Sequence, residues 1–200
     1  MKQVLLILIL MSNFQLAQTQ DKLHLNFDTN IELDQNELER MSIEYERTSF
    51  FKRNNFQSSH LLSLNEVIDK DSLSECIYRF TYLRTFHNAI VIGLENKNDT
   101  IQIYWKVSDG LGGYQPGKII EYKTKQLSIS DWNDFERKIE DIDFWNLPIE
   151  NTWFGYDGSG WLLEGKRLKQ YHIVNRWCGQ ELTSIGRMLI KFTDLEIKIY

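Results

Sequence analysis

Residues 76–107 read CIYRFTYLRTFHNAIVIGLENKNDTIQIYWKV, and the spacing of their apolar side chains decides the fold class. Apolar residues occupy nearly every even position over 78–94 and every second position over 101–107. A period of two is typical of a β-strand with one buried face. Residues 96–99 are turn formers, so the two segments are predicted to form a hairpin. The first segment is either two strands or one bent strand.

Arg84 and Asn88 interrupt this apolar face. A buried guanidinium without partners is costly, so Arg84 is expected to pair, to stack or to lie at a rim of the sheet. Glu164 or Asp157 could serve as a planar carboxylate partner, which would make Arg84 structural. Alternatively, Arg84 points into a pocket and binds an anionic ligand.

The rest of the chain adds strands and two helices. Residues 108–117 read SDGLGGYQPG, a glycine-rich loop before another strand. Residues 130–145 show the clearest amphipathic helical pattern, and a second one follows near 182–192. These elements predict an α+β fold: a single antiparallel, curved β-sheet with two main helices packed against it.

Residues 157–177 predict another hairpin, with apolar residues on both faces of its strands, so this part of the sheet is expected to be covered on both sides, at least partly. With a four-residue turn, Glu164 faces Tyr171 and His172 faces Leu163. An odd turn or a bulge would make Glu164 and His172 direct neighbours. Only that second register gives a carboxylate–imidazole pair capable of general base catalysis.

Glu164, His172 and Asp157 are therefore the catalytic candidates, although local hydrolase signatures are missing. Ser159 lies between glycines but precedes a strand, whereas a nucleophile elbow leads into a helix. The four histidines are dispersed along the chain. Neither a metal site nor a cofactor is expected from these patterns.

Residues 1–18 have the layout of a secretory signal peptide: a positive start, eight apolar residues and a polar segment of small residues. Eight apolar residues are too few to cross a bilayer, which needs about 20 in a helix. We expect export to the periplasm or the outside of the cell, with no transmembrane segment after cleavage. Residues 19–74 are an N-terminal extension of undefined order, and residues 75–200 are the α+β domain.

Export bears on Cys76 and Cys178, the two cysteines of the chain. In an oxidising compartment they are a candidate disulfide, and the alternative is two buried, unpaired thiols. A bridge closing a loop of about 100 residues could stabilise the fold by up to ~4.7 kcal/mol. It requires that the two Cβ atoms meet.

The charge and the aromatic residues of the chain limit the classes of partner that it can bind. The chain has 28 acidic and 23 basic side chains, a net charge of -5, and no basic stripe, which argues against nucleic acid. Several aromatic residues fall at predicted strand ends or in loops, where rings can stack on sugars or anchor protein partners, unless they cover the edges of the core. These residues are Trp105, Tyr114, Trp153, Phe154, Tyr156 and Trp177.

Five motifs carry a resemblance to a known family: RTFH at 84–87, DGLGGY at 109–114, FWNLP at 144–148, DGSGWLLEG at 157–165 and YHIVNRW at 171–177. The chain resembles, over about residues 75–192, a family of uncharacterised, often exported bacterial proteins with no assigned activity. The resemblance implies that seven residues belong to one shared site or folding network. They are Arg84, His87, Asp157, Trp161, Glu164, His172 and Arg176.

The function predicted from the sequence is an exported, non-catalytic binding or interaction module of the envelope or the extracellular space. Its unknown ligand, a protein or another envelope component, would lie against the glycine-rich loop and the last hairpin. The binding candidates are Arg84, His87, Tyr114, Trp161, Arg176 and Trp177. One alternative is a hydrolase of envelope material that uses Glu164 or Asp157 with His172. A second alternative is an inhibitor or immunity-type protein.

Overall fold

The computed structural model describes residues 55–66, 76–98, 100–151, 155, 157–168 and 170–200. The chain divides into two compact units, 1–62 and 63–200. In the first unit the described residues belong to a helix over 55–63, which ends just inside the second unit. The predicted signal peptide lies outside the described residues, as does most of the predicted extension. No helix in the described part of the chain is long and apolar enough to span a bilayer.

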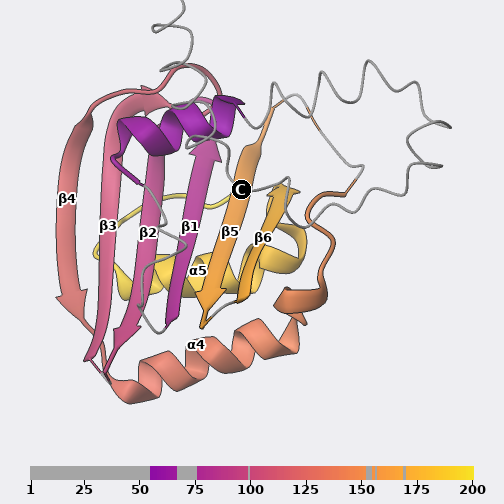
Figure 1. The fold of residues 1–200 in the computed structure, drawn as a ribbon. Helices are drawn as coiled ribbons and strands as arrows, with labels where there is room; N and C mark the ends of the chain where they lie inside the picture. Colours follow the sequence, from indigo (N-terminus) through magenta and orange to yellow (C-terminus); the bar gives the residue numbers. More distant parts are fainter. Residues whose placement is uncertain (1–54, 67–75, 99, 152–154, 156, 169) are drawn as a thin grey trace, which may run out of the picture. The chain divides into compact units, whose positions relative to one another are not determined.

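The second unit is built on one six-stranded antiparallel sheet, in the order β4-β3-β2-β1-β5-β6 (Figure 1). The strands are β1 (Cys76–Arg84), β2 (Asn88–Lys97), β3 (Thr100–Leu111), β4 (Ile119–Gln126), β5 (Ser159–Arg167) and β6 (Gln170–Trp177). The segment over 78–94 is thus two strands joined by a tight turn. β1 lies at the centre of the sheet because it pairs with both β2 and β5.

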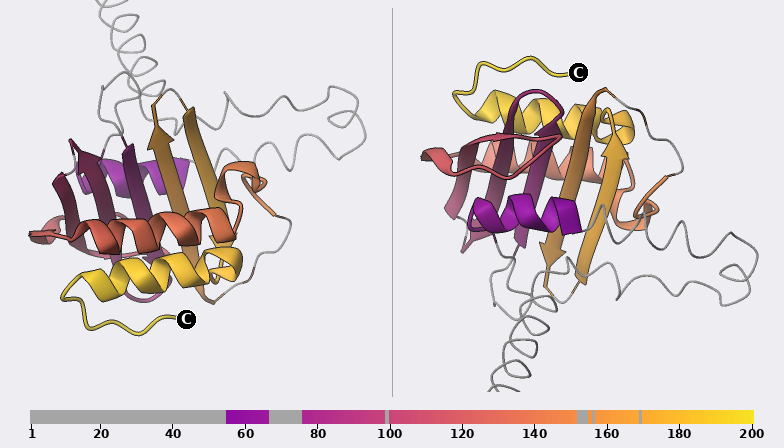
Figure 2. Two further views of the ribbon diagram at one scale, coloured as in Figure 1. Left: turned by 90° about the horizontal axis from the view of Figure 1, so that it is seen from below. Right: turned by 90° about the horizontal axis from the view of Figure 1, so that it is seen from above.

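Two α-helices cover one face of this sheet (Figure 2). They are α4 (Ile129–Asp141) and α5 (Thr183–Phe192), with the short 3-10 helices η2 (Phe144–Asn146) and η3 (Gln180–Leu182) beside them in the chain. The prediction of an α+β fold with a single antiparallel sheet and two main helices is confirmed. Residues 195–199 alternate apolar and polar side chains as a strand would, but they form no strand, and Leu195, Ile197 and Ile199 pack against the core without strand pairing.

Helix α4 begins slightly earlier than its sequence pattern suggests. Ser128 is the N-cap, and its side chain accepts a hydrogen bond from the Asp131 backbone N–H, while the Asp131 carboxylate accepts one from the Ser128 backbone. This capping box satisfies two donors that the first turn leaves free. Trp132, Phe135 and Ile139 form the buried face of α4, as their spacing predicts.

We call the covered side of the sheet the helical face. It carries the even-numbered apolar residues of β1 and β2 and the odd-numbered ones of β3 and β5, as their pairing requires. Tyr78, Phe80 and Trp161 are almost completely buried there. Their contact with the apolar stripes of α4 and α5 makes this side the main hydrophobic core of the domain.

The opposite side, which we call the second face, is buried as well. Val91, Leu162 and Ile173 project from it and are at most 1% exposed. This confirms that the last hairpin lies in a sheet covered on both sides. Gly93 makes room here for Tyr104 of the neighbouring strand, since a Cβ on Gly93 would lie 2.1 Å from the tyrosine ring.

Of the two alternatives for Cys76 and Cys178, the candidate disulfide is wrong, because both thiols are free. Cys76 opens β1, whereas the backbone N–H of Cys178 bonds to Ser159, which pairs with Arg84 at the other end of β1. Eight residue steps along a strand span about 26 Å, far beyond the reach of a disulfide. The Cys76 thiol instead lies 3.7 Å from a Glu136 carboxylate oxygen, and burial together with that carboxylate raises the pKa of Cys76 to about 12.

Candidate functional site

The register of the last hairpin separates Glu164 from His172. β5 pairs with β6 so that Glu164 lies opposite Ile173 and Gly165 lies opposite His172. Neither of the two registers considered from the sequence occurs. Residues paired across antiparallel strands project to the same face, so Glu164 lies on the second face and His172 on the helical face. The hypothetical carboxylate–imidazole pair is excluded by the thickness of the sheet.

Glu164 is instead the acceptor of a buried arginine that the sequence pattern did not single out. Arg79 lies directly opposite Glu164 on β1. Its Nε atom donates a hydrogen bond of 2.6 Å to Glu164 Oε2, and its Nη2 atom donates one of 2.6 Å to Glu164 Oε1. This is the bidentate geometry of a strong ion pair. Both residues are at most 1% exposed.

A buried polar network extends from this pair across the second face. Tyr171 donates to Glu164 at 2.7 Å, and Tyr104 donates to Glu66 at 2.9 Å. Glu66 also lies 2.7 Å from Lys106 and 3.6 Å from Arg79. We call these residues the buried ion network: Glu66, Arg79, Tyr104, Lys106, Glu164 and Tyr171. The network thus contains two cations, Arg79 and Lys106, and two carboxyl side chains, Glu66 and Glu164, so its formal charges balance.

Burial and the neighbouring carboxylates shift the pKa values of the two phenols and of Arg79 upward. Burial and the Glu164 carboxylate raise the pKa of Tyr171, and burial and Glu66 raise that of Tyr104, so both phenols stay protonated. Burial lowers the pKa of Arg79, but the adjacent Glu164 more than offsets this and raises it overall. A carboxylate that is fully engaged by such donors is a poor general base. The arrangement is suited to holding strands β1, β3 and β5 together.

His172 and Arg176 lie together on β6, on the helical face, where they bind the segment after η2. The Nε2 atom of His172 donates to the Leu147 carbonyl at 3.0 Å, and Arg176 donates to the Ile149 carbonyl at 3.2 Å. Arg176 also pairs with Glu181 at 2.9 Å. Burial lowers the pKa of His172, because the imidazolium would lose hydration among the rings of η2. These two residues attach a loop to a strand.

Trp161 and Arg176 are therefore not surface residues, which corrects their prediction as ligand contacts. Trp161 is 1% exposed, its ring lies 5.2 Å from that of Phe80, and its indole N–H donates to Ser159. Arg176 is 2% exposed. Trp105 is also buried, although its place in the sequence suggested an exposed ring. Trp153, Phe154 and Tyr156 lie outside the described residues.

Three of the quoted motifs do meet, at the end of the sheet where β1 ends. The backbone N–H of Thr85 bonds to Gly158, Gly112 bonds to the His87 carbonyl, and Gly113 bonds to the Thr85 carbonyl. The RTFH turn, the glycine-rich loop and the start of the DGSGW motif are thus linked through their backbones. We call this region the loop end and define it by residues 84–88, 109–117 and 157–159.

Glycine is required where the loop crosses the turn. A Cβ on Gly112 would lie 2.5 Å from the Arg84 backbone nitrogen, and one on Gly113 would lie 2.7 Å from the Thr85 Cα atom. Both distances are too short for any side chain, so backbone packs directly on backbone. The loop is held against the turn and presents its side chains outward.

Arg84 lies beneath this surface, and no described residue offers it a carboxylate partner. It donates to the Asn88 carbonyl at 3.1 Å and its guanidinium lies over the Tyr82 ring, 5.6 Å from the centroid. Among the described residues, its buried Nε atom has no hydrogen-bond acceptor. Burial lowers the pKa of Arg84. The expected pairing with Glu164 or Asp157 does not occur, since Glu164 binds Arg79 and Asp157 is exposed.

The exposed part of the loop end is aromatic and apolar. Phe86 and Tyr114 are each 54% exposed, their ring centroids lie 6.1 Å apart, and Leu111 is 41% exposed beside them. A shallow pocket of about 280 Å³ adjoins them, lined by Asp109, Gly110, Leu111, Tyr114 and Gln115. His87 is exposed nearby and its Nδ1 atom lies 2.7 Å from the Tyr200 hydroxyl. Trp177 is half-buried at the same end.

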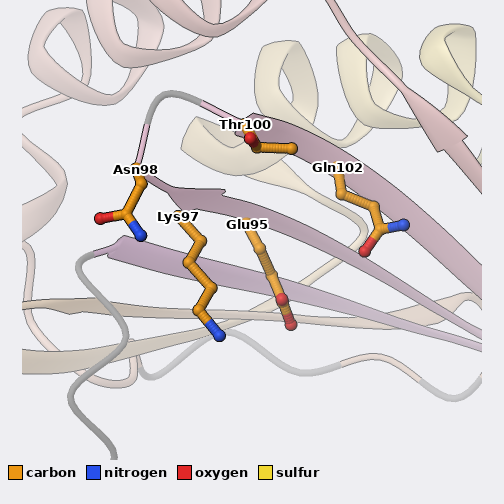
Figure 3. A pocket seen from close by; sticks show the side chains of 5 residues that line it. All are labelled: Glu95, Lys97, Asn98, Thr100 and Gln102. Carbon is orange, nitrogen blue, oxygen red and sulfur yellow. The ribbon is translucent and has the colours of Figure 1, made fainter.

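A second pocket, of about 340 Å³, lies at the tip of the β2–β3 hairpin (Figure 3). Its lining residues are Glu95, Lys97, Asn98, Thr100 and Gln102. Burial raises the pKa of Glu95. The lining contains no aromatic ring and no nucleophile paired with a base. In the described part of the chain, no group of three His, Cys, Asp or Glu residues is placed to bind a metal ion.

The structure thus splits the predicted site into three places. Arg84, His87, Tyr114, Asp157 and Trp177 lie at or near the loop end; Glu164 lies in the buried ion network; Trp161, His172 and Arg176 lie on the helical face. Comparison with known proteins adds no assignment, because no protein-family model matches the chain and a search of curated proteins finds no match.

Proposed function

We propose that the protein is an exported, non-catalytic binding module whose ligand surface is the loop end. The observation that carries this proposal is the exposed pair of rings, Phe86 and Tyr114, with Leu111 beside them. Large rings held on a preorganised backbone are typical anchors in binding surfaces, because little conformational entropy is lost on association.

Two further features support binding over catalysis. One of the candidate bases, Glu164, is bonded to Arg79 and Tyr171 in the sheet interior, and His172 is on the opposite face. The loop end offers rings, amide groups and the Asp109 carboxylate around a shallow pocket, a composition that suits contact with a sugar chain or a protein surface. An inhibitor or immunity-type protein would be a special case of this function.

The test compares exposed apolar side chains at two places. Phe86→Ala and Tyr114→Ala remove rings from the loop end, and Leu168→Ala removes a still more exposed apolar side chain from the β5–β6 turn. Retention of the purified mature chain on envelope polysaccharide of the producing cell is measured for each variant. We expect a loss of about tenfold or more for both ring variants, and no change for the Leu168 variant.

A photo-reactive amino acid placed at position 86 or 168 in living cells covers the case of a protein ligand. A defined adduct from position 86 alone would identify that partner, while an intact mass lacking the signal peptide would support export. Equal retention of all variants, together with no adduct specific to position 86, would rule out the loop end as the ligand surface.

A further inference from the structure

The two edge strands of the sheet, β6 and β4, differ in how far other residues cover them. At β6, the Asn175 backbone N–H donates to the Ile149 carbonyl at 2.7 Å, and side chains of β6 hold residues 147–150 along that edge. At β4, every residue is exposed except Glu121, which is half-buried. An uncovered edge strand presents free N–H and C=O groups and can pair with another strand.

The apolar half of β4 makes this edge unusual for a solvent-exposed strand. Ile120 and Tyr122 are 61% and 60% exposed, and Ile119 is 40% exposed. Such a strand would be an aggregation hazard if any partner strand could join it. Lys123 and Lys125 follow in the same strand and repel a partner of like charge. The lysines of β4 therefore favour a partner strand that places a negative charge opposite them.

We propose that β4 pairs antiparallel with β4 of a second copy of this chain, centred on Tyr122, so that two sheets join into one. In this register Glu121 lies opposite Lys123 of the second copy, and the reverse pair forms by symmetry. Centring the pairing on Glu121 would place the two Glu121 carboxylates opposite each other. Centring it on Lys123 would place the two Lys123 ammonium groups opposite each other. Only the register centred on Tyr122 turns both positions into attractive pairs.

The side chains also fit this register by face. Glu121 and Lys123 pair with Val107 and Trp105 on β3 and so lie on the helical face. Tyr122 pairs with Lys106 and lies on the second face, where it meets Tyr122 of the second copy. A two-fold axis perpendicular to the sheet keeps like faces together, which places both helical layers on one side.

Glu121 and Lys123, which would bridge the two copies, already lie close together within one copy. The Glu121 carboxylate accepts a hydrogen bond from the Trp105 indole at 2.8 Å and lies 3.3 Å from Lys123. The Trp105 bond, together with Lys123, lowers the pKa of Glu121. Joining two copies would therefore form an alternating ring of four charges, with both carboxylates ionised near neutral pH.

Charge reversal tests the register. The mature chain is studied by sedimentation velocity from about 1 µM to about 100 µM, a range that covers a weak but specific dimer. We expect a monomer–dimer equilibrium for the wild type. Glu121→Lys and Lys123→Glu each turn both bridging pairs repulsive and should weaken self-association by at least about tenfold.

A mixture of the two single variants is the decisive sample. One copy then carries two lysines and the other carries two glutamates at positions 121 and 123, so both bridging pairs are attractive again. Native mass spectrometry with one isotope-labelled variant should show the mixed dimer, and this result also shows that both variants are folded. A wild type that stays monomeric over this range, or a mixture that forms no mixed dimer, would overturn the proposal.

Discussion

Two arginines of β1 show how the surroundings of a guanidinium decide its role. Arg79 and Arg84 are both buried, but among the described residues Arg79 has a bidentate carboxylate partner, whereas Arg84 has a backbone carbonyl and a ring. Removing one member of a buried ion pair leaves the other charge without compensation. Removing a guanidinium that balances no carboxylate leaves no such charge behind.

We therefore expect Arg79→Met to lower the free energy of unfolding by about 3–5 kcal/mol, because the carboxyl group of Glu164 would lose its bidentate partner in the sheet interior. The matched variant Arg84→Met should cost about 1 kcal/mol. Urea unfolding followed by circular dichroism measures both. Adding Glu164→Gln to Arg79→Met should recover part of the loss, since the amide still accepts from Tyr171. Equal costs for the two arginine variants would contradict the structural role assigned to the buried ion network.

Arg79 also marks the limit of prediction from the sequence. The alternation that revealed Tyr78, Phe80 and Tyr82 as core residues assigned the odd positions of β1 to solvent. That inference holds only for a sheet with one buried face. Here both faces are buried, so a polar residue at an odd position is a paired interior group. Apolar residues on both faces of the last hairpin indicated that the sheet is covered on both sides there. Applying the same expectation to the central strand β1 would have identified Arg79 as a buried residue that needs a partner.

We expect the attachment of the segment after η2 to β6 to depend on pH through His172. His172 donates from Nε2 to the Leu147 carbonyl and packs against Phe144. Burial lowers the pKa of His172 in the folded chain, below the value of about 6.5 expected in the unfolded chain. As the pH falls through that value, the unfolded chain binds the proton first, so the free energy of unfolding decreases.

His172→Gln removes this titration and keeps an N–H group that can donate to Leu147. Between about pH 7.5 and pH 5.5, the wild type should lose more stability than this variant, in urea titrations at each pH. Acidic groups with shifted pKa values titrate in both proteins and cancel in the difference. If the free energy of unfolding of the two proteins changes equally with pH, burial does not lower the pKa of His172.

Turn length was the element-scale property that the sequence could not supply. The β5–β6 connection is shorter than the four residues considered, and Arg167 pairs with Gln170. A change of one residue in register exchanges the faces of a whole strand, so the position of His172 relative to Glu164 depended on this single count. The contact of the glycine-rich loop with the RTFH turn was not predicted either, although Gly112 and Gly113 are residues that such close backbone contact requires.

At the scale of the whole molecule, the sheet has a protected centre, one covered edge and one open edge. β1, β2 and β5 are buried on both faces, β6 is covered along its edge by residues 147–150, and β4 is exposed. Local opening is easiest where few buried contacts hold the backbone. We expect amide hydrogen exchange to be slowest in β1, β2 and β5 and fastest in β4. β6 should exchange more slowly than β4, although both are edge strands.

Protein concentration separates intrinsic exposure from pairing between copies. If two copies join through β4, raising the concentration into the range where they associate should slow exchange in β4 and leave β6 unchanged. The Lys123→Glu variant is the control, because protection of its β4 should require at least about tenfold higher concentration than in the wild type. Protection that rises equally in β4 and β6 would indicate nonspecific association, since residues 147–150 already lie along the β6 edge and bond to Asn175 there.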